Sequence, residues 1–152
     1  MSKDDGVDSI NCGNKTLPCK TLQIALSLQV SNGTNKRNIF LTGKIEESVK
    51  YTINTTIILD HSVHLKKHPF TSTIKNPIIV WDPQPKEFHP AIFIMKHNEN
   101  FSLSSVDVET NASQVLLSID DKYSPDTIEI FDSHILSHSK SNIIDISSFC
   151  WR

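Results

Sequence analysis

An eight-residue pattern of apolar and polar positions recurs along the chain and predicts short strands. It is clearest in residues 128–135, IEIFDSHI, with apolar residues at the first, third and eighth positions and Asp132 at the fifth. A looser copy begins 27 residues earlier at Phe101, and two more begin at Ile78 and Thr56, at steps of 23 and 22 residues. Alternate strand residues share a face, and a short polar residue at the fifth position suits a corner. Strand, corner and strand at such intervals predict a solenoid with one copy per turn.

Other apolar runs extend the predicted strands over most of the chain. Ile, Val and Thr together make up a quarter of the 152 residues, which favours strands over helices. The further strands are expected at residues 39–41, 51–59, 63–65, 73–74, 78–81, 91–95, 115–119 and 143–146. Residues 82–90, rich in proline, and residues 120–126 are expected to leave the solenoid as loops. Residues 1–11 are polar and are expected to be flexible.

Residues 12–26, CGNKTLPCKTLQIAL, introduce the one helix that the sequence predicts. Pro18 suits a first helical turn, and Thr21 suits an N-cap. An apolar face follows at Leu22, Ala25, Leu26 and Val30, and Asn32-Gly33 suits a stop. We therefore expect a helix at about residues 19–31 that packs its apolar face on the core.

This CG…PCKTLQ-A-L segment resembles the N-terminal leading segment of right-handed parallel β-helix proteins of the pectin-lyase-like superfamily. The likeness is strongest to large repetitive surface proteins of protists and bacteria, and it covers about fifteen residues. It implies an all-β fold, a short right-handed parallel β-helix (solenoid) whose open end is closed by an N-terminal capping α-helix. Residues 12–152 would form this single domain. Because an uncapped end exposes strand edges and apolar interior, the helix is expected to be structural.

Five glycosylation acceptor patterns and a pair of cysteines indicate the cellular compartment of the protein. The possible N-glycosylation sites are Asn14, Asn32, Asn54, Asn100 and Asn111. With 11 Asn and 30 Ser plus Thr, roughly two such patterns would arise by chance, so accidental matches stay an alternative. Cys12 and Cys19 close a short loop that suits a disulfide. Together these features favour an extracellular or cell-surface protein.

Residues 1–5 carry no apolar segment of a signal peptide. Two interpretations remain: a cytosolic protein, or a chain whose natural start lies further upstream, and the sequons favour the second. At the other end, Cys150 has no obvious partner and no polar capping element follows the last predicted strand. We expect further turns of the solenoid beyond the C-terminus, and self-association of residues 1–152 through the open end.

Charge and hydropathy narrow the classes of partner. The net charge is −2 with both signs scattered, so no nucleic acid or anionic membrane surface is expected as a partner. No apolar run approaches the ~20 residues of a membrane-spanning helix. The resemblance instead implies a polysaccharide or a cell-surface glycan as the ligand.

The catalytic groups of the superfamily's lyases and hydrolases are not recognisable. Lyases of this kind use Ca²⁺ and a cationic base, commonly Arg, but Arg37 precedes the first strand and Arg152 is the last residue. Hydrolases need paired carboxylates, and Asp120 and Asp121 are the nearest candidates. We assign no catalytic, cofactor-binding or metal-binding residue. A Ca²⁺ ion between stacked corner carboxylates of Asp60 and Asp82 is the one cofactor alternative.

Histidines and aromatic residues offer few further candidates. His61, His64 and His68, like His134 and His138, are expected to be separately exposed, because neighbours in a strand alternate between faces. Trp81 ends an apolar run and is expected in the core. Phe88, in the proline-rich loop, is the best exposed aromatic. It joins Asp120 and Asp121 as a weak ligand-contact candidate.

The sequence therefore predicts a non-catalytic extracellular β-helix module with a structural or adhesive role, and with glycan as the expected ligand. The expected binding surface is a shallow face around Ser102, Ser104, Asn111 and Ser113, walled by the loops at 82–90 and 120–126. Two alternatives stay open. The chain is the N-terminal fragment of a pectin-lyase-like polysaccharide lyase or glycoside hydrolase, or it is a structural spacer without a ligand.

Overall fold

The computed structural model describes residues 1–28, 36–42, 48–69, 75–83, 91–95, 99–110, 115–119, 127–137 and 144–145. These ranges contain the α-helix α1 (Leu22–Ser27) and twelve short strands. No helix in the described ranges combines the length and the apolar character needed to cross a bilayer.

The strands form three sheets of four parallel strands, and each of the first nine strands pairs with the strand three places further along the chain. The β1 sheet contains β1 (Lys36–Leu41), β4 (Ser62–Lys67), β7 (Phe101–Ser104) and β10 (Ile128–Phe131). The β2 sheet contains β2 (Lys50–Ile53), β5 (Ile78–Trp81), β8 (Asp107–Thr110) and β11 (Ile135–Ser137). The β3 sheet contains β3 (Ile57–Leu59), β6 (Ala91–Met95), β9 (Val115–Ile119) and β12 (Ile144–Asp145).

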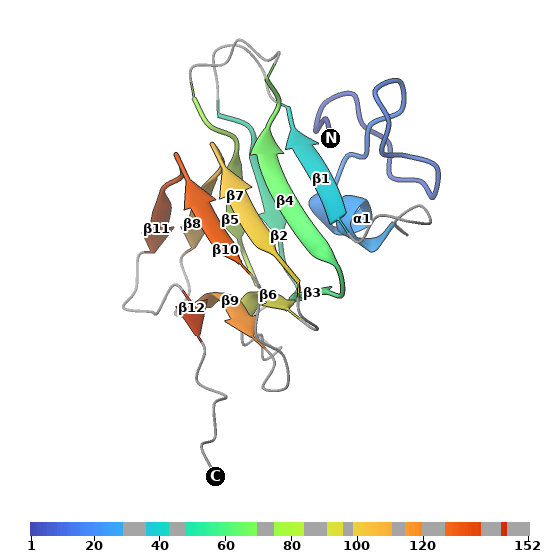
Figure 1. Cartoon of the computed structure of the whole chain (residues 1–152). Coiled ribbons are helices and arrows are strands. Elements are labelled where there is room, and N and C mark those ends of the chain that lie inside the picture. Colours follow the sequence, from blue (N-terminus) through green and yellow to red (C-terminus); the bar gives the residue numbers. More distant parts are fainter. Residues whose placement is uncertain are drawn as a thin grey trace.

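The chain passes through the three sheets in turn, so three consecutive strands make one turn of a parallel β-solenoid. In Figure 1 the β1 sheet faces the viewer, the β2 sheet lies behind it and the β3 sheet crosses below. All nine strand pairings are parallel. The prediction of an all-β, parallel, solenoid-type fold agrees with this arrangement.

The core lies between the three sheets and is built from residues that stack in register. Val63 pairs with Phe101 and Leu65 with Leu103, and all four side chains are buried. The ring of Phe101 contacts that of Phe93 in the β3 sheet, with centroids 5.4 Å apart. Trp81 is buried, as its sequence context predicted. Each fully buried side chain of this size contributes roughly 1.5–3 kcal/mol relative to an exposed one.

The 27-residue repeat is confirmed for the last two turns. Phe101 pairs with Ile128, and the corners that follow them contain Ser105 and Asp132, 27 residues apart. Both corner residues have positive φ, 55° and 49°, a conformation that short polar side chains tolerate better than branched ones. The predicted corner is therefore a left-handed backbone position between the β1 sheet and the β2 sheet.

The two earlier copies of the repeat were placed in the wrong register. Ile78 does not stack on Phe101; it pairs with Lys50 and Asp107 in the β2 sheet. Successive turns differ in length, since His64 and Ser102 occupy equivalent positions 38 residues apart. A short alternating pattern contains no information on the length of inserted segments. The template therefore matched strands that belong to different sheets.

Helix α1 has the predicted cap and the predicted buried face, but it begins three residues later than expected. Thr21 is the N-cap, and its Oγ1 accepts from the Ile24 N–H at 3.4 Å. The N–H groups of Lys20 and Thr21 donate to Asp8 Oδ1 at 3.0 and 2.9 Å, and Thr21 has extended dihedrals. These bonds hold the chain outside the helix until Leu22. The helix also ends earlier than expected, at Ser27, because Leu28 is its C-cap and has extended dihedrals. Residues 29–31 of the expected helix lie outside the described part of the chain.

The apolar face of α1 rests on the first turn of strands. Leu22, Ala25 and Leu26 are buried, and the helix contacts β2 and β3. Its polar side is tied to the connection between these strands. There, Gln23 Nε2 donates to Asn54 Oδ1 at 3.3 Å and to Thr55 Oγ1 at 2.5 Å. The helix therefore covers one end of the stacked sheets (Figure 1).

Residues 1–11, expected to be flexible, make main-chain contacts with β1 and with the disulfide loop, the segment that the Cys12–Cys19 disulfide closes. The Met1 ammonium donates to Phe40 O at 2.6 Å, and Ser2 N donates to Cys19 O at 3.0 Å. At Gly6 a Cβ would lie only 2.2 Å from Ser2 O and 2.7 Å from Cys19 O, so only glycine fits this approach. The flexibility of residues 1–11 stays a prediction.

Candidate functional site

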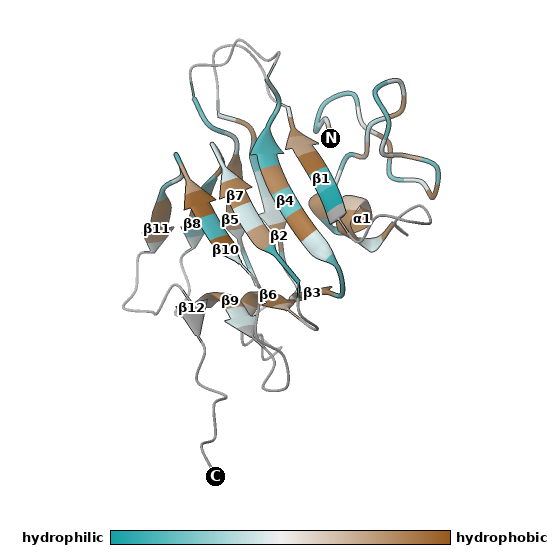
Figure 2. Cartoon of the chain, viewed as in Figure 1, coloured by the Kyte–Doolittle hydropathy of each residue, from teal (hydrophilic) through white to brown (hydrophobic). Residues whose placement is uncertain are grey.

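The outward side of the β1 sheet carries two rows of side chains that we call the polar face. The register of the four strands places Asn38, His64, Ser102 and Glu129 in the first row. The second row contains Phe40, Lys66, Ser104 and Phe131. These positions alternate with core residues such as Leu65 and Leu103, so they lie on the opposite side of the sheet. Figure 2 shows the alternation as hydrophilic and hydrophobic bands along β4 and β10.

A buried polar pair occupies the middle of the first row. Ser102 Oγ lies 2.7 Å from His64 Nδ1, and the two residues are 5% and 8% exposed. The expectation that His64 is an exposed histidine is therefore wrong, because the sheet pairs it with Ser102 on the neighbouring strand. A serine hydroxyl beside an imidazole is a combination used for nucleophilic catalysis. At this burial, neither group presents a reactive atom to a polymeric ligand.

The accessible part of the polar face is the set of residues around this pair. Phe40 and Phe131 stand at the two ends of the second row, 40% and 72% exposed. Three strand spacings separate them, roughly 14 Å at ~4.8 Å for each spacing. Lys66 and Ser104 lie between them, and exposed Asn38 and Glu129 lie at the ends of the first row.

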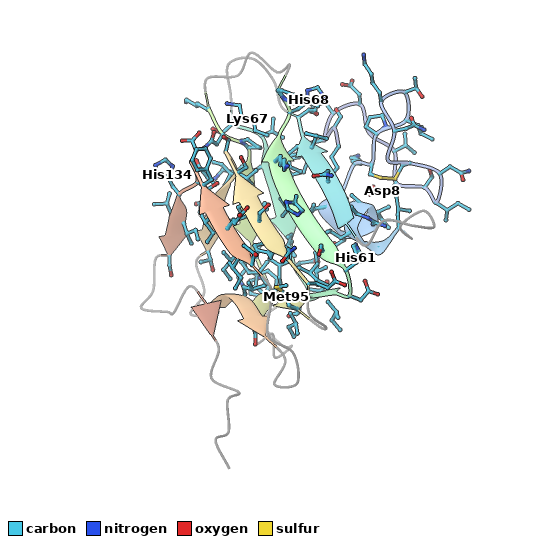
Figure 3. All side chains as sticks on the ribbon, viewed as in Figure 1. Asp8, His61, Lys67, His68, Met95 and His134 are labelled. Atoms are coloured by element: carbon cyan, nitrogen blue, oxygen red, sulfur yellow. A yellow bond between two sulfur atoms is a disulfide. The ribbon has the colours of Figure 1, made fainter. Side chains whose placement is uncertain are left out.

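Polar contacts support both ends of β4. At its start, Ser62 Oγ donates to Glu99 Oε2 at 2.6 Å and accepts from the Asn100 N–H at 2.9 Å. Beyond its end, the His68 ring meets the Phe40 ring edge-on, with centroids 5.8 Å apart. Figure 3 shows His61 at the first end of β4, and Lys67 and His68 at the second. The face is thus held by bonds that run between strands rather than by local turns.

A second group of polar side chains lies where the β1 sheet meets the β2 sheet. Asn76 Nδ2 donates to Asp107 Oδ1 at 3.1 Å and to Asp132 O at 3.0 Å. The His134 N–H donates to the same Asp107 oxygen at 2.9 Å, and Ser105 Oγ donates to Asp132 Oδ2 at 2.9 Å. These bonds link three successive turns. Together they form a hydrogen-bonded network at the corner, which we call the corner staple.

The hydrogen bonds of the corner staple lower the pKa of Asp107. Partial burial raises it, but hydrogen bonds from the Asn76 side chain and the His134 N–H outweigh burial, so the pKa lies below its ordinary value of 3.8. The pKa of Asp60 is also lowered, first by the hydrogen bond from His61, whose Nδ1 lies 2.6 Å from Asp60 Oδ1. The Asp60 carboxylate is mostly exposed, so this shift carries little stability.

The stacking of Asp60 on Asp82 is contradicted. Asp60 follows β3 in the β3 sheet, whereas Asp82 follows β5 in the β2 sheet, so the two carboxylates end different sheets. Among the described residues, no group of three or more His, Cys, Asp or Glu side chains could hold a metal ion. Arg37, expected before the first strand, instead lies within β1, and its Nη1 donates to Ala25 O at 2.6 Å.

The structure places part of the predicted site residues. Cys12 and Cys19 are joined in a disulfide and are buried. Asn14 and Asn54 are exposed, Asn100 is half-buried, Ser104 is half-buried and Ser102 is buried. The remaining candidates lie outside the described residues, namely Asn32, Asn111, Ser113, Phe88, Asp120, Asp121, His138, Cys150 and Arg152. The same holds for residues 84–90 and 120–126 of the predicted loops.

Sequence reasoning missed most of the polar face. It named Ser102 and Ser104, but not Phe40, Phe131 or Lys66. The signal was available in part, since Ser104 and Phe131 occupy the same position, the fourth, in the two good copies of the repeat. Phe40 and Lys66 needed the strand register, which the irregular turn lengths conceal.

No family model matches this chain, and neither a curated protein nor a solved structure matches it significantly.

Proposed function

We propose that this chain is a non-catalytic, extracellular or cell-surface module that binds an extended glycan across the polar face. The observation that carries the proposal is the second row, where two exposed phenylalanines bracket Lys66 and Ser104. An aromatic ring offers a large apolar surface, which suits the apolar face of a sugar ring. The ammonium of Lys66 and the hydroxyl of Ser104 lie between the rings and suit sugar hydroxyls, as do the amide of Asn38 and the carboxylate of Glu129 in the first row.

The flatness of the sheet favours a polymer over a small ligand. Parallel strands repeat at ~4.8 Å, so the polar face offers a regular ladder rather than a concave pocket. A chain of linked sugars that crosses the strands from Phe40 to Phe131 meets both rings and the polar groups between them. In this proposal the buried His64–Ser102 pair links β4 to β7 and keeps the face rigid, and the exposed residues contact the glycan.

The fold and the disulfide support the rest of the proposal. The leading segment at residues 12–26 resembles that of the pectin-lyase-like superfamily, and we propose the right-handed form of the parallel β-helix for this chain. Disulfides persist in oxidising compartments, so the Cys12–Cys19 bond supports export. An adhesive or structural role on a cell surface follows from binding without turnover.

A binding assay with matched variants tests the proposal. Affinity electrophoresis and calorimetry are run with a panel of soluble neutral and acidic polysaccharides, with Ca²⁺ present. We expect at least one to bind, and Phe131→Ala or Phe40→Ala to weaken it at least fivefold, since truncating an aromatic anchor costs more than about 1 kcal/mol. Leu136→Ala is the control, because Leu136 is equally apolar and 59% exposed but lies in the β2 sheet.

Three results would overturn the proposal. Equal loss of binding in Leu136→Ala and Phe131→Ala would show that the glycan does not bind specifically to the polar face. The absence of binding to every polysaccharide would favour the structural spacer. Release of new reducing ends or of unsaturated products from the bound polymer would make the chain part of an enzyme.

A further inference from the structure

The three described glycosylation sequons lie in different surroundings. Asn14 lies in the loop that the Cys12–Cys19 disulfide closes. Asn54 lies between β2 and β3, where its Oδ1 accepts from Gln23. Asn100 immediately precedes β7 in the β1 sheet. An acceptor sequon must be accessible at the surface, so the three sites differ in how readily they can carry a glycan.

At Asn14 the whole sequon is exposed and is already folded into a compact turn. Asn14 Oδ1 accepts from Thr16 N at 3.0 Å, from Thr16 Oγ1 at 2.9 Å and from Leu17 N at 2.7 Å. Asn14, Lys15 and Thr16 are all exposed. The oxygen of the amide is therefore engaged with the turn, and the sequon hydroxyl lies against the amide that would be modified.

At Asn100 the sequon is part of the sheet. The Asn100 N–H donates to Ser62 Oγ, and its carbonyl accepts from the Val63 N–H at 2.9 Å. Phe101 is buried in the core, and Ser102, the sequon hydroxyl, is buried against His64. A glycan on Asn100 would place a bulky hydrophilic group beside the start of β4, where the Asn100 main chain is hydrogen-bonded to Ser62 and Val63.

We infer that Asn14 carries an N-linked glycan in the exported protein and that Asn100 does not. In the transfer, Asn14 Nδ2 attacks the anomeric carbon of a glycosyl diphosphate donor. The new C–N bond forms as the bond from carbon to the diphosphate oxygen breaks, and Nδ2 gives its proton to a base of the transferase. The glycan then projects from the disulfide loop, while the sheets and the core stay unchanged.

Site mapping of the secreted protein tests the inference. The full chain is expressed behind a secretory leader in a eukaryotic cell, and the secreted monomer is digested and mapped by mass spectrometry. Enzymatic deglycosylation in heavy-oxygen water marks each occupied Asn. We expect the Asn14 peptide to be occupied and the Asn100 peptide to be unmodified. Accordingly, Asn14→Gln removes one glycan from the intact mass, and Asn100→Gln leaves the mass of the attached glycans unchanged.

Matched variants separate loss of the sequon from loss of the fold. Lys15→Pro blocks the acceptor pattern while keeping Asn14 and Thr16, so it also removes one glycan. Thr16→Ser keeps the hydroxyl and retains the glycan. An unmodified Asn14 in the secreted wild-type chain would overturn the inference, as would an occupied Asn100 in the folded monomer.

Discussion

Ser102 Oγ and His64 Nδ1 lie 2.7 Å apart and join two strands whose contacting residues are 38 positions apart in the sequence. The pair lies on the outward side of the β1 sheet, yet both side chains are buried. Buried polar groups destabilise a fold unless they are hydrogen-bonded, so this contact offsets part of the cost of burying the two side chains. The contact therefore contributes to the pairing of β4 with β7 as well as to the polar face.

Removing the hydroxyl of Ser102 should destabilise the fold. Ser102→Ala removes the hydroxyl that is hydrogen-bonded to the buried His64 Nδ1, and the loss of such a bond costs about 1 kcal/mol. Urea unfolding followed by circular dichroism measures the change. Ser104→Ala, at the next outward position of β7 but half-buried, is the control and should change stability by no more than about 0.5 kcal/mol. Equal effects of the two substitutions would show that the pair adds nothing.

The corner staple should make stability depend on pH through Asp107. Its pKa is depressed below 3.8 in the folded chain, so the unfolded state binds more protons as the medium becomes acidic. The contribution of Asp107 is present above about pH 4 and is lost as the pH falls through the folded pKa. The stability difference between wild type and Asp107→Asn should therefore stay constant from about pH 6 to pH 4 and shrink as the pH falls below about 4. Exposed Asp82 is the control site, and a constant difference at Asp107 would contradict the assignment.

The disulfide should stabilise the end of the solenoid that α1 covers. Replacing both Cys12 and Cys19 by Ser frees the loop in the unfolded state and should cost about 2–3 kcal/mol on the chain-entropy account. Thermal unfolding of the two forms measures the loss, and peptide mapping without reduction checks the bond. Free thiols at both positions in protein exported through an oxidising compartment would refute the pairing.

Gly6 should hold residues 1–11 against the disulfide loop. In Gly6→Ala the new Cβ meets the main chain of Ser2 and Cys19, and such overpacking costs about 1–3 kcal/mol. Hydrogen exchange should show faster exchange at Ser2 and Val7, whose N–H groups donate to Cys19 O and Pro18 O. Val7→Ala, a truncation of an exposed side chain, should leave the Ser2 amide protected. Rapid exchange of both amides in the wild-type chain would instead support the predicted flexibility.

Some features of the fold were determined locally and could be predicted from the sequence. The alternation at Phe101 and Leu103 fixes which face of β7 is buried, and the same alternation recurs at Ile128 and Ile130, which pair with these two residues. Ser105 and Asp132 mark the corner because a short polar side chain tolerates positive φ. The N-cap Thr21 and the buried face of α1 follow from helix periodicity. Each of these depends only on residues within a few positions of one another.

Only the tertiary structure decided how the turns stack. The steps between equivalent strands are unequal, so the register of the first two turns, and with it the true place of Ile78, depended on pairing across inserted segments. The polar face follows from that register, because Phe40, Lys66, Ser104 and Phe131 become neighbours only when four strands align. Strand register is set by burying one face of every strand at once. This is a property of the whole core, and no short stretch of sequence contains it.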